Sequence, residues 1–223
     1  MPYVHGETLR ERMTRESQLP LGDALRITRE VASALDYAHG AGYMHRDVTP
    51  DNIMVTTKHD TMLADFGIAR PMKDASGRAR DGIMDVEIAR TTTGFVIGSP
   101  QYMSPEQIGG DPSLDGRTDQ YSLGTVLYET LASETPFAGR NAQAVVAKMF
   151  AGAHRRFGSC APTFPSPLTT RSGAHFRWWR NDRFASIPDF AEALHIASSE
   201  GRVGISGAAT RFAPRLRAWR ARE

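Results

Sequence analysis

Residues 121–131 constrain the fold of this 223-residue chain more than any other segment. Apolar and aromatic side chains fall on several faces of a helix drawn through them: Tyr121, Leu123, Val126, Leu127, Tyr128 and Leu131. A helix that is apolar almost all round must be covered on every side, so it belongs at the centre of a domain. The sequence therefore predicts a domain built around this helix.

Three other segments show the apolar spacing of amphipathic helices. Apolar residues recur every three or four positions in residues 21–39, 142–150 and 187–194. The first of these helices is expected to end at Gly40 and Gly42, because glycine is common just beyond a helix C-terminus.

Two short apolar runs, 53–55 and 62–64, lie on either side of the polar turn 56–60. Their length and the turn between them predict a β hairpin. With the helices above, this predicts an α+β fold that is mainly helical.

Two segments lack a helical or strand period. Residues 70–98 form a polar stretch that is longer than most connections, and we interpret it as a regulatory loop. Residues 152–181 contain three prolines and many arginines. We expect one domain over residues 1–198 and a basic tail over residues 199–223.

Composition excludes several classes of protein. Lysine and arginine number 27 against 25 acidic residues, and a net charge of +2 gives no argument for a nucleic-acid or membrane-surface partner. The lone Cys160 excludes an intrachain disulfide framework and fits a reducing compartment, so a cytoplasmic location is expected. No run of 18 apolar residues marks a membrane segment.

Short motifs then follow one another along the chain: His45-Arg46-Asp47, with Asn52 five positions after the aspartate; Asp65-Phe66-Gly67; Gly98-Ser99-Pro100; Ser104-Pro105-Glu106; Asp119 at the start of the central helix; and Arg183. In this order the set resembles the catalytic domain of bacterial-type (Hanks-like) serine/threonine protein kinases. The resemblance covers most of residues 1–198, and it implies a protein-kinase-like fold.

The resemblance implies roles for the loop residues. Asp47 would orient a substrate serine or threonine hydroxyl and accept its proton, and Asn52 and Asp65 would bind Mg²⁺. The adenine of ATP would lie against Met54, at a hinge formed by the backbone of two residues, Pro2 and Val4.

Other positions would be regulatory or structural. Arg46 would pair with a phosphorylated residue of the regulatory loop, for which the candidates are Thr91 and Thr93. His45 and Phe66 would align the two loops, and Asp119 would stand at the start of the central helix. The resemblance also pairs Glu106 with Arg183. The implied partners are a protein substrate and an activating kinase or a second copy of the chain.

Three features depart from the family pattern. No Gly-x-Gly-x-x-Gly motif is present, and Lys148 lies in a helical stripe instead of a strand before the hinge. Thr49 stands where serine/threonine kinases carry lysine, and by analogy with losing one transition-state donor this costs on the order of 10²- to 10³-fold in rate. We therefore expect Met1 to be an internal methionine and the N-terminal lobe to be missing.

The third departure is the irregular stretch 152–181, where the family has further helix-forming residues. Compensating frameshifts or decay of an unselected sequence would explain it, and so would a divergent but ordered loop. Two functions therefore remain open. One is a serine/threonine kinase, inactive as this chain alone, and the other is a non-catalytic kinase-like binding module or gene remnant.

Overall fold

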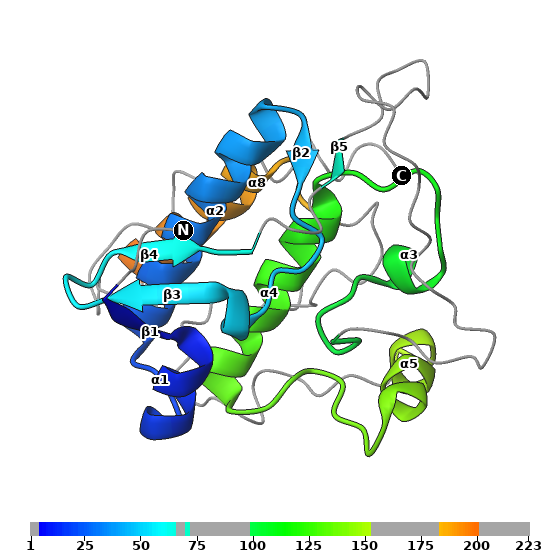
Figure 1. Cartoon of the computed structure of the whole chain (residues 1–223), viewed down its shortest axis with the longest axis horizontal. Helices are drawn as coiled ribbons and strands as arrows, with labels where there is room; N and C mark the ends of the chain where they lie inside the picture. The colour runs from blue at the N-terminus through cyan, green and yellow to red at the C-terminus, as the bar shows by residue number, and fades with distance from the viewer. Residues whose placement is uncertain (1–4, 66–69, 72–98, 153–182, 201–223) are drawn as a thin grey trace.

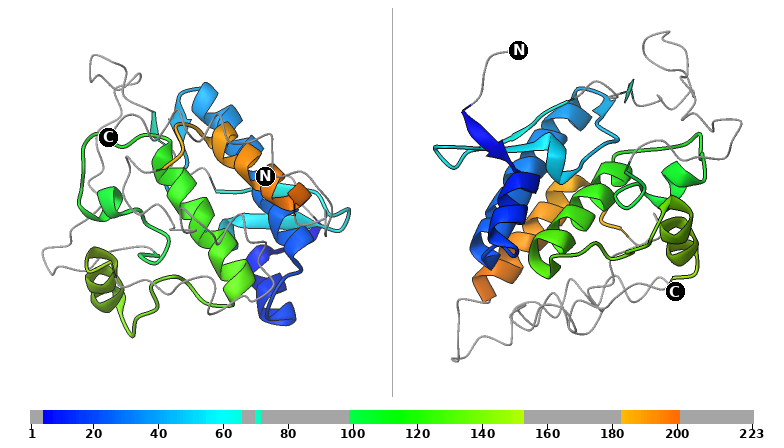
Figure 2. Two further views of the ribbon diagram at one scale, coloured as in Figure 1. Left: turned by 180° about the vertical axis from the view of Figure 1, so that it is seen from behind. Right: turned by 60° about the horizontal axis from the view of Figure 1, so that its bottom comes forward.

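The computed structural model describes residues 5–65, 70–71, 99–152 and 183–200. Helix α4 (Arg117–Ala132) runs through the middle of the molecule, as the sequence predicts (Figure 1). Helix α2 (Leu21–Gly40) packs along one side of it, and α8 (Ile187–Glu200) contacts both (Figure 2). The three helices form the scaffold on which the remaining elements are held.

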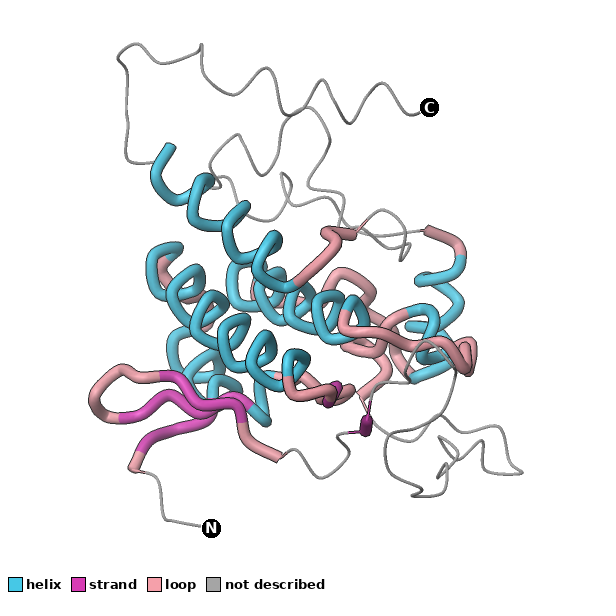
Figure 3. The backbone as a smooth tube through the Cα atoms, turned by 90° about the horizontal axis from the view of Figure 1, so that it is seen from above, coloured by secondary structure: helices cyan, strands magenta, loops and turns pink. Residues whose placement is uncertain are grey.

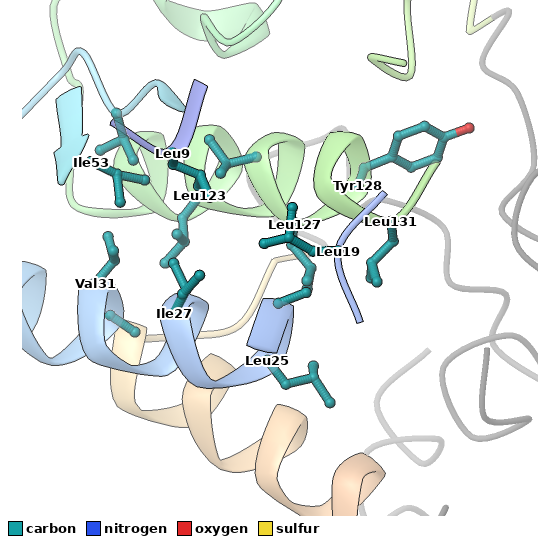
Figure 4. Packing of buried hydrophobic residues seen from close by; sticks show 14 of the residues in the cluster. Leu9, Leu19, Leu25, Ile27, Val31, Ile53, Leu123, Leu127, Tyr128 and Leu131 are labelled. Atoms are coloured by element: carbon teal, nitrogen blue, oxygen red, sulfur yellow. The ribbon is translucent and has the colours of Figure 1, made fainter. Parts of the chain in front are cut away.

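The main core lies between α4 and α2. Leu123, Leu127 and Leu131 of α4 belong to one buried cluster with Ile27 and Val31 of α2, and Figure 4 shows these side chains meeting. Burial of α4 extends to its polar residues, including Thr118, Asp119 and Thr125, so the prediction of a helix covered on nearly all sides is confirmed.

A small antiparallel sheet lies to one side of the helices (Figure 3). Strands β3 (Ile53–Thr56) and β4 (Thr61–Leu63) form the expected hairpin, in which Met54 lies opposite Met62. The sequence did not reveal β1 (Gly6–Thr8), which adds a third strand on the other edge of β3. A two-residue pair, β2 (Tyr43–Met44) with β5 (Arg70–Pro71), forms a separate ladder.

Helix α1 (Leu9–Glu16) is also absent from the sequence-based expectation. It has only two buried apolar residues, Leu9 and Met13, one turn apart, which is too few to show a period. A different signal marks its start. The Thr8 hydroxyl accepts from the backbone N–H of Glu11 while the Glu11 carboxylate accepts from that of Thr8, and this capping box can be recognised in sequence.

The remaining elements are short. The 3₁₀ turn η1 (Pro50–Asn52) precedes β3, and α3 (Pro105–Ile108) and α5 (Ala142–Phe150) lie on the far side of α4 from the sheet (Figure 1). The predicted helices at 142–150 and 187–194 are confirmed, and the second continues to Glu200. Within the described residues, no helix combines the length and the apolar character needed to cross a bilayer. Nearly all of the two irregular segments lies outside the described ranges.

Candidate active site

The segment that joins β2 to β3 (Figure 1) carries Asp47 and Asn52, whose side chains are hydrogen-bonded to each other. The side-chain amide of Asn52 donates to Asp47 Oδ2 at 3.0 Å and to the Asp47 carbonyl oxygen at 2.9 Å. The η1 turn makes this possible, because the Asn52 N–H donates back to the Thr49 carbonyl oxygen at 3.1 Å. The loop therefore presents a carboxylate held by a neighbouring amide.

His45 connects this loop to the end of β4. Its side chain is fully buried, with Nε2 3.0 Å from the Ala64 carbonyl oxygen and Nδ1 3.3 Å from the Asp47 backbone nitrogen. Because a carbonyl oxygen only accepts and an N–H only donates, the imidazole is the neutral tautomer that carries its proton on Nε2. His45 thus holds the residue before Asp65 against the loop that carries Asp47.

Asp119, near the start of α4, is hydrogen-bonded to the backbone of the same loop. Its carboxylate is completely buried and accepts from the backbone N–H groups of His45, at 2.9 Å, and of Arg46, at 2.7 Å. His39 Nε2 lies 2.7 Å from the same carboxylate and donates to it. Arg46 has a φ of 68°, a left-handed conformation that costs a non-glycine residue on the order of 1–3 kcal/mol, so these bonds hold a strained turn.

Asp65 and Asn52 fit a magnesium site of the kind completed by substrate phosphates. The Asn52 amide nitrogen donates to Asp47, which leaves the amide oxygen free to bind a metal ion. The backbone N–H of Ala64, the residue before Asp65, donates to the Asn52 carbonyl oxygen at 2.8 Å, so the backbone at Asp65 lies close to Asn52. Mg²⁺ is commonly held by one or two side-chain oxygens together with phosphates and waters. Among the described residues, no group of three or more His, Cys, Asp or Glu side chains forms a self-sufficient metal site.

Thr49 and Met54 occupy different environments beside the loop. Thr49, at the position where the family carries lysine, is buried. Met54 is half-buried in β3, and its cross-strand neighbour Met62 is 45% exposed. An apolar strip therefore lies on the sheet next to the loop.

The structure brings Glu106 and Arg183 together, although 77 positions separate them. Arg183 Nη1 and Nη2 lie 2.5 and 2.9 Å from the two carboxylate oxygens, and both side chains are almost fully buried. Arg183 also donates to the Arg117 carbonyl oxygen at 2.9 Å and stacks over the Tyr121 ring. Burial raises the pKa of Glu106, but the hydrogen bonds and charge of Arg183 outweigh it, so the pKa is lowered from its ordinary value.

We expect Glu106→Gln to lower the free energy of unfolding by about 2 kcal/mol at pH 7, because it removes the charge of a hydrogen-bonded buried pair. A carboxyl whose pKa is depressed in the folded state stabilises the protein above its unfolded pKa, and this stabilisation is lost as the pH falls through the folded pKa. The difference between wild type and variant in urea unfolding should therefore shrink below about pH 4.5.

Glu30→Gln is the matched control, since Glu30 also pairs with an arginine, Arg26, but with side chains that are 37% and 27% exposed. We expect it to change stability by less than about 0.5 kcal/mol. A Glu106→Gln deficit that stays constant from pH 7 to pH 3 would contradict the role given to the charged pair.

A further cluster was not found from sequence. Arg10 of α1 donates to Glu129 of α4 at 2.7 Å and to Asp51 beside the loop at 3.3 Å, and it also bonds Tyr102. Tyr102 in turn donates to Glu129 at 2.5 Å, and burial together with Glu129 raises the pKa of the phenol. These residues lie up to 119 positions apart and form no short motif, so no local pattern could have indicated them.

The remaining predicted site residues lie outside the described residues: Pro2, Val4, Phe66, Thr91 and Thr93.

Comparison with known proteins places the chain in a family. The family model described as "Protein kinase domain" matches residues 1–200, and the chain therefore belongs to this family. The relatives that it matches include PknB, a serine/threonine-protein kinase of Mycobacterium leprae, at 42% identity over 139 residues, which is 62% of this chain and 20% of that protein. A probable serine/threonine-protein kinase PknB of Bifidobacterium longum is 33% identical over 190 residues, 85% of this chain and 26% of that protein.

The chain thus spans only about a fifth to a quarter of the length of these relatives. The expected kinase-like fold, mainly helical with a small antiparallel sheet, agrees with the family and with the structure.

Proposed function

We propose that this chain carries the phosphoacceptor side of a serine/threonine protein kinase active site, which transfers the γ-phosphate of ATP to protein hydroxyls. The observation that supports this most is the position of Asp47, whose carboxylate is oriented by Asn52 and whose backbone is held by His45. Phosphoryl transfer requires such positioning more than covalent chemistry from the protein.

In this proposal Asp47 accepts a hydrogen bond from the substrate hydroxyl and orients its oxygen towards the γ-phosphate. It receives the proton as the new O–P bond forms and the bond from the γ-phosphorus to the bridging oxygen breaks, with ADP as the leaving group. Asn52 keeps the carboxylate in place, and Asn52 with Asp65 would hold Mg²⁺, which neutralises phosphate charge when bound. Met54 and the exposed Met62 would provide the apolar surface for adenine.

We further propose that Arg46 pairs with phosphate on Thr91 or Thr93 when an activating kinase or a second copy modifies the chain. The domain would extend over residues 1–198, followed by a basic tail, and it would work in the cytoplasm.

A second function has its own support. The 223 residues contain no Gly-x-Gly-x-x-Gly motif, and the position of the family's lysine is occupied by the buried Thr49. The buried threonine at the lysine position favours a kinase-like module that binds a partner without transferring phosphate.

We expect the purified 223-residue chain to transfer no measurable phosphate from Mg-ATP to generic serine/threonine substrates, because residues that cover and grip the phosphates are not among those present. A fusion that places the glycine-rich-loop lobe of a related bacterial kinase before Met1 should restore transfer, measured with radiolabelled ATP. Robust transfer by the 223 residues alone would contradict the need for that lobe. A folded, ATP-binding fusion without activity would favour the binding-module alternative.

Within the fusion, Thr49→Lys should raise kcat by about 10²-fold, because a lysine there supplies a charge for the transferring phosphate. Thr57→Lys is a suitable control, since Thr57 lies in the exposed hairpin turn and the new lysine adds the same charge away from the loop. Equal kcat for wild type and Thr49→Lys would show that this loop works without the lysine.

A further inference from the structure

Gln107 joins the end of the segment 99–108 to the loop that carries Asp47. It is almost fully buried in α3, and its side-chain amide donates to the Arg46 carbonyl oxygen at 2.9 Å. The two residues are 61 positions apart in the sequence. This partly buried bond constrains the orientation of the peptide group between Arg46 and Asp47.

The oxygen of the same Gln107 side-chain amide is also hydrogen-bonded. Its Oε1 accepts from the Ser104 backbone N–H at 3.0 Å, and the backbone N–H of Gln107 donates to the Ser104 hydroxyl at 3.3 Å. This capping box fixes the start of α3. A single amide group therefore ties the chain at Ser104 to the peptide group at Arg46.

The hydrogen bond from Gln107 reaches Arg46, whose backbone conformation is strained. Its φ of 68° is held on the N–H side by Asp119 and on the carbonyl side by Gln107. The Asp47 N–H belongs to the same peptide group as the Arg46 carbonyl and donates to His45. A rotation of this peptide would therefore move the backbone of Asp47 itself.

We propose that Gln107 is a positioning residue that couples the segment 99–108 to the Asp47 loop. The inference rests on the proposed function for its catalytic meaning. A displacement of the segment at Ser104 withdraws the donor from Arg46 and releases the strained turn beside Asp47. Because such a coupling is reciprocal, a fixed Asp47 loop also holds the segment in place.

Two variants separate the donor from the rest of the side chain. Gln107→Glu keeps an oxygen that can accept from Ser104 but replaces the donor with a carboxylate oxygen, whereas Gln107→Met removes both the donor and that acceptor at nearly the same length. Gln18→Glu is the matched control, because the Gln18 amide also donates to a backbone carbonyl, that of Leu131, away from the loop.

The test is amide hydrogen exchange, followed by NMR on the ¹⁵N-labelled 223-residue chain without ATP. At pH 8, exchange of the Asp47 amide should be at least about ten-fold faster in Gln107→Glu and Gln107→Met than in wild type, with α4 amides such as Leu127 unchanged. Lowering the pH should return the ratio to wild type towards one in Gln107→Glu only, since a protonated carboxyl donates again. Gln18→Glu should leave Asp47 unchanged.

Unchanged Asp47 exchange in the two Gln107 variants would overturn the proposal. An equal increase across the whole chain would also overturn it, because Gln107 would then only support overall stability. The measurement involves no phosphoryl transfer, so its result is independent of whether the proposed kinase activity is found.

Discussion

Asp119→Ala should lower the free energy of unfolding by about 3–5 kcal/mol, because it removes the acceptor of several buried donors at once. The backbone N–H groups of His45 and Arg46 and the ring of His39 all donate to this fully buried carboxylate. Alanine leaves these donors without an acceptor at a position that is closed to bulk water. Urea unfolding followed by circular dichroism measures the loss.

Asp36→Ala provides the control, since Asp36 is an exposed residue of the neighbouring helix α2. We expect it to stay within about 0.5 kcal/mol of wild type. Hydrogen exchange should also rise first at His45 and Arg46 in Asp119→Ala. A loss smaller than about 1 kcal/mol, or an equal loss in Asp36→Ala, would mean that the Asp119 carboxylate does not hold the loop.

The long elements of the fold could be predicted from the sequence because they bury a periodic face. Helices α2 and α4 and the hairpin β3–β4 appear where the apolar spacing places them. The elements that were missed, α1 and β1, are short and expose much of their surface, so their formation depends on tertiary contacts more than on a local pattern.

The site also contains residues that the sequence identified and contacts that it could not predict. The resemblance to the kinase family identified Asp47, Asn52 and Asp119, but no spacing in the sequence predicts that Asp119 lies under residues 45 and 46, more than 70 positions away. His39 belongs to no short motif in the sequence, yet its ring donates to the same Asp119 carboxylate. Gln107 was not singled out, because a lone glutamine beside Glu106 carries no sequence signal of its own.

In the proposed function, Asp47 is the residue that orients the substrate hydroxyl and accepts its proton. Its environment differs from that of the nearby acid Asp51, which is exposed and paired with Arg10. A variant of each residue therefore separates a specific role of Asp47 from the general negative charge of the loop.

The direct measurement is single-turnover phosphoryl transfer by the fusion protein described above. We expect Asp47→Asn to lower the transfer rate by about 10³- to 10⁴-fold with unchanged ATP affinity, because the asparagine cannot accept the proton. Asp51→Asn should change the rate by less than about ten-fold, because Asp51 makes only an exposed surface pair. Transfer by Asp47→Asn at the wild-type rate, or an equal loss in Asp51→Asn, would contradict the account.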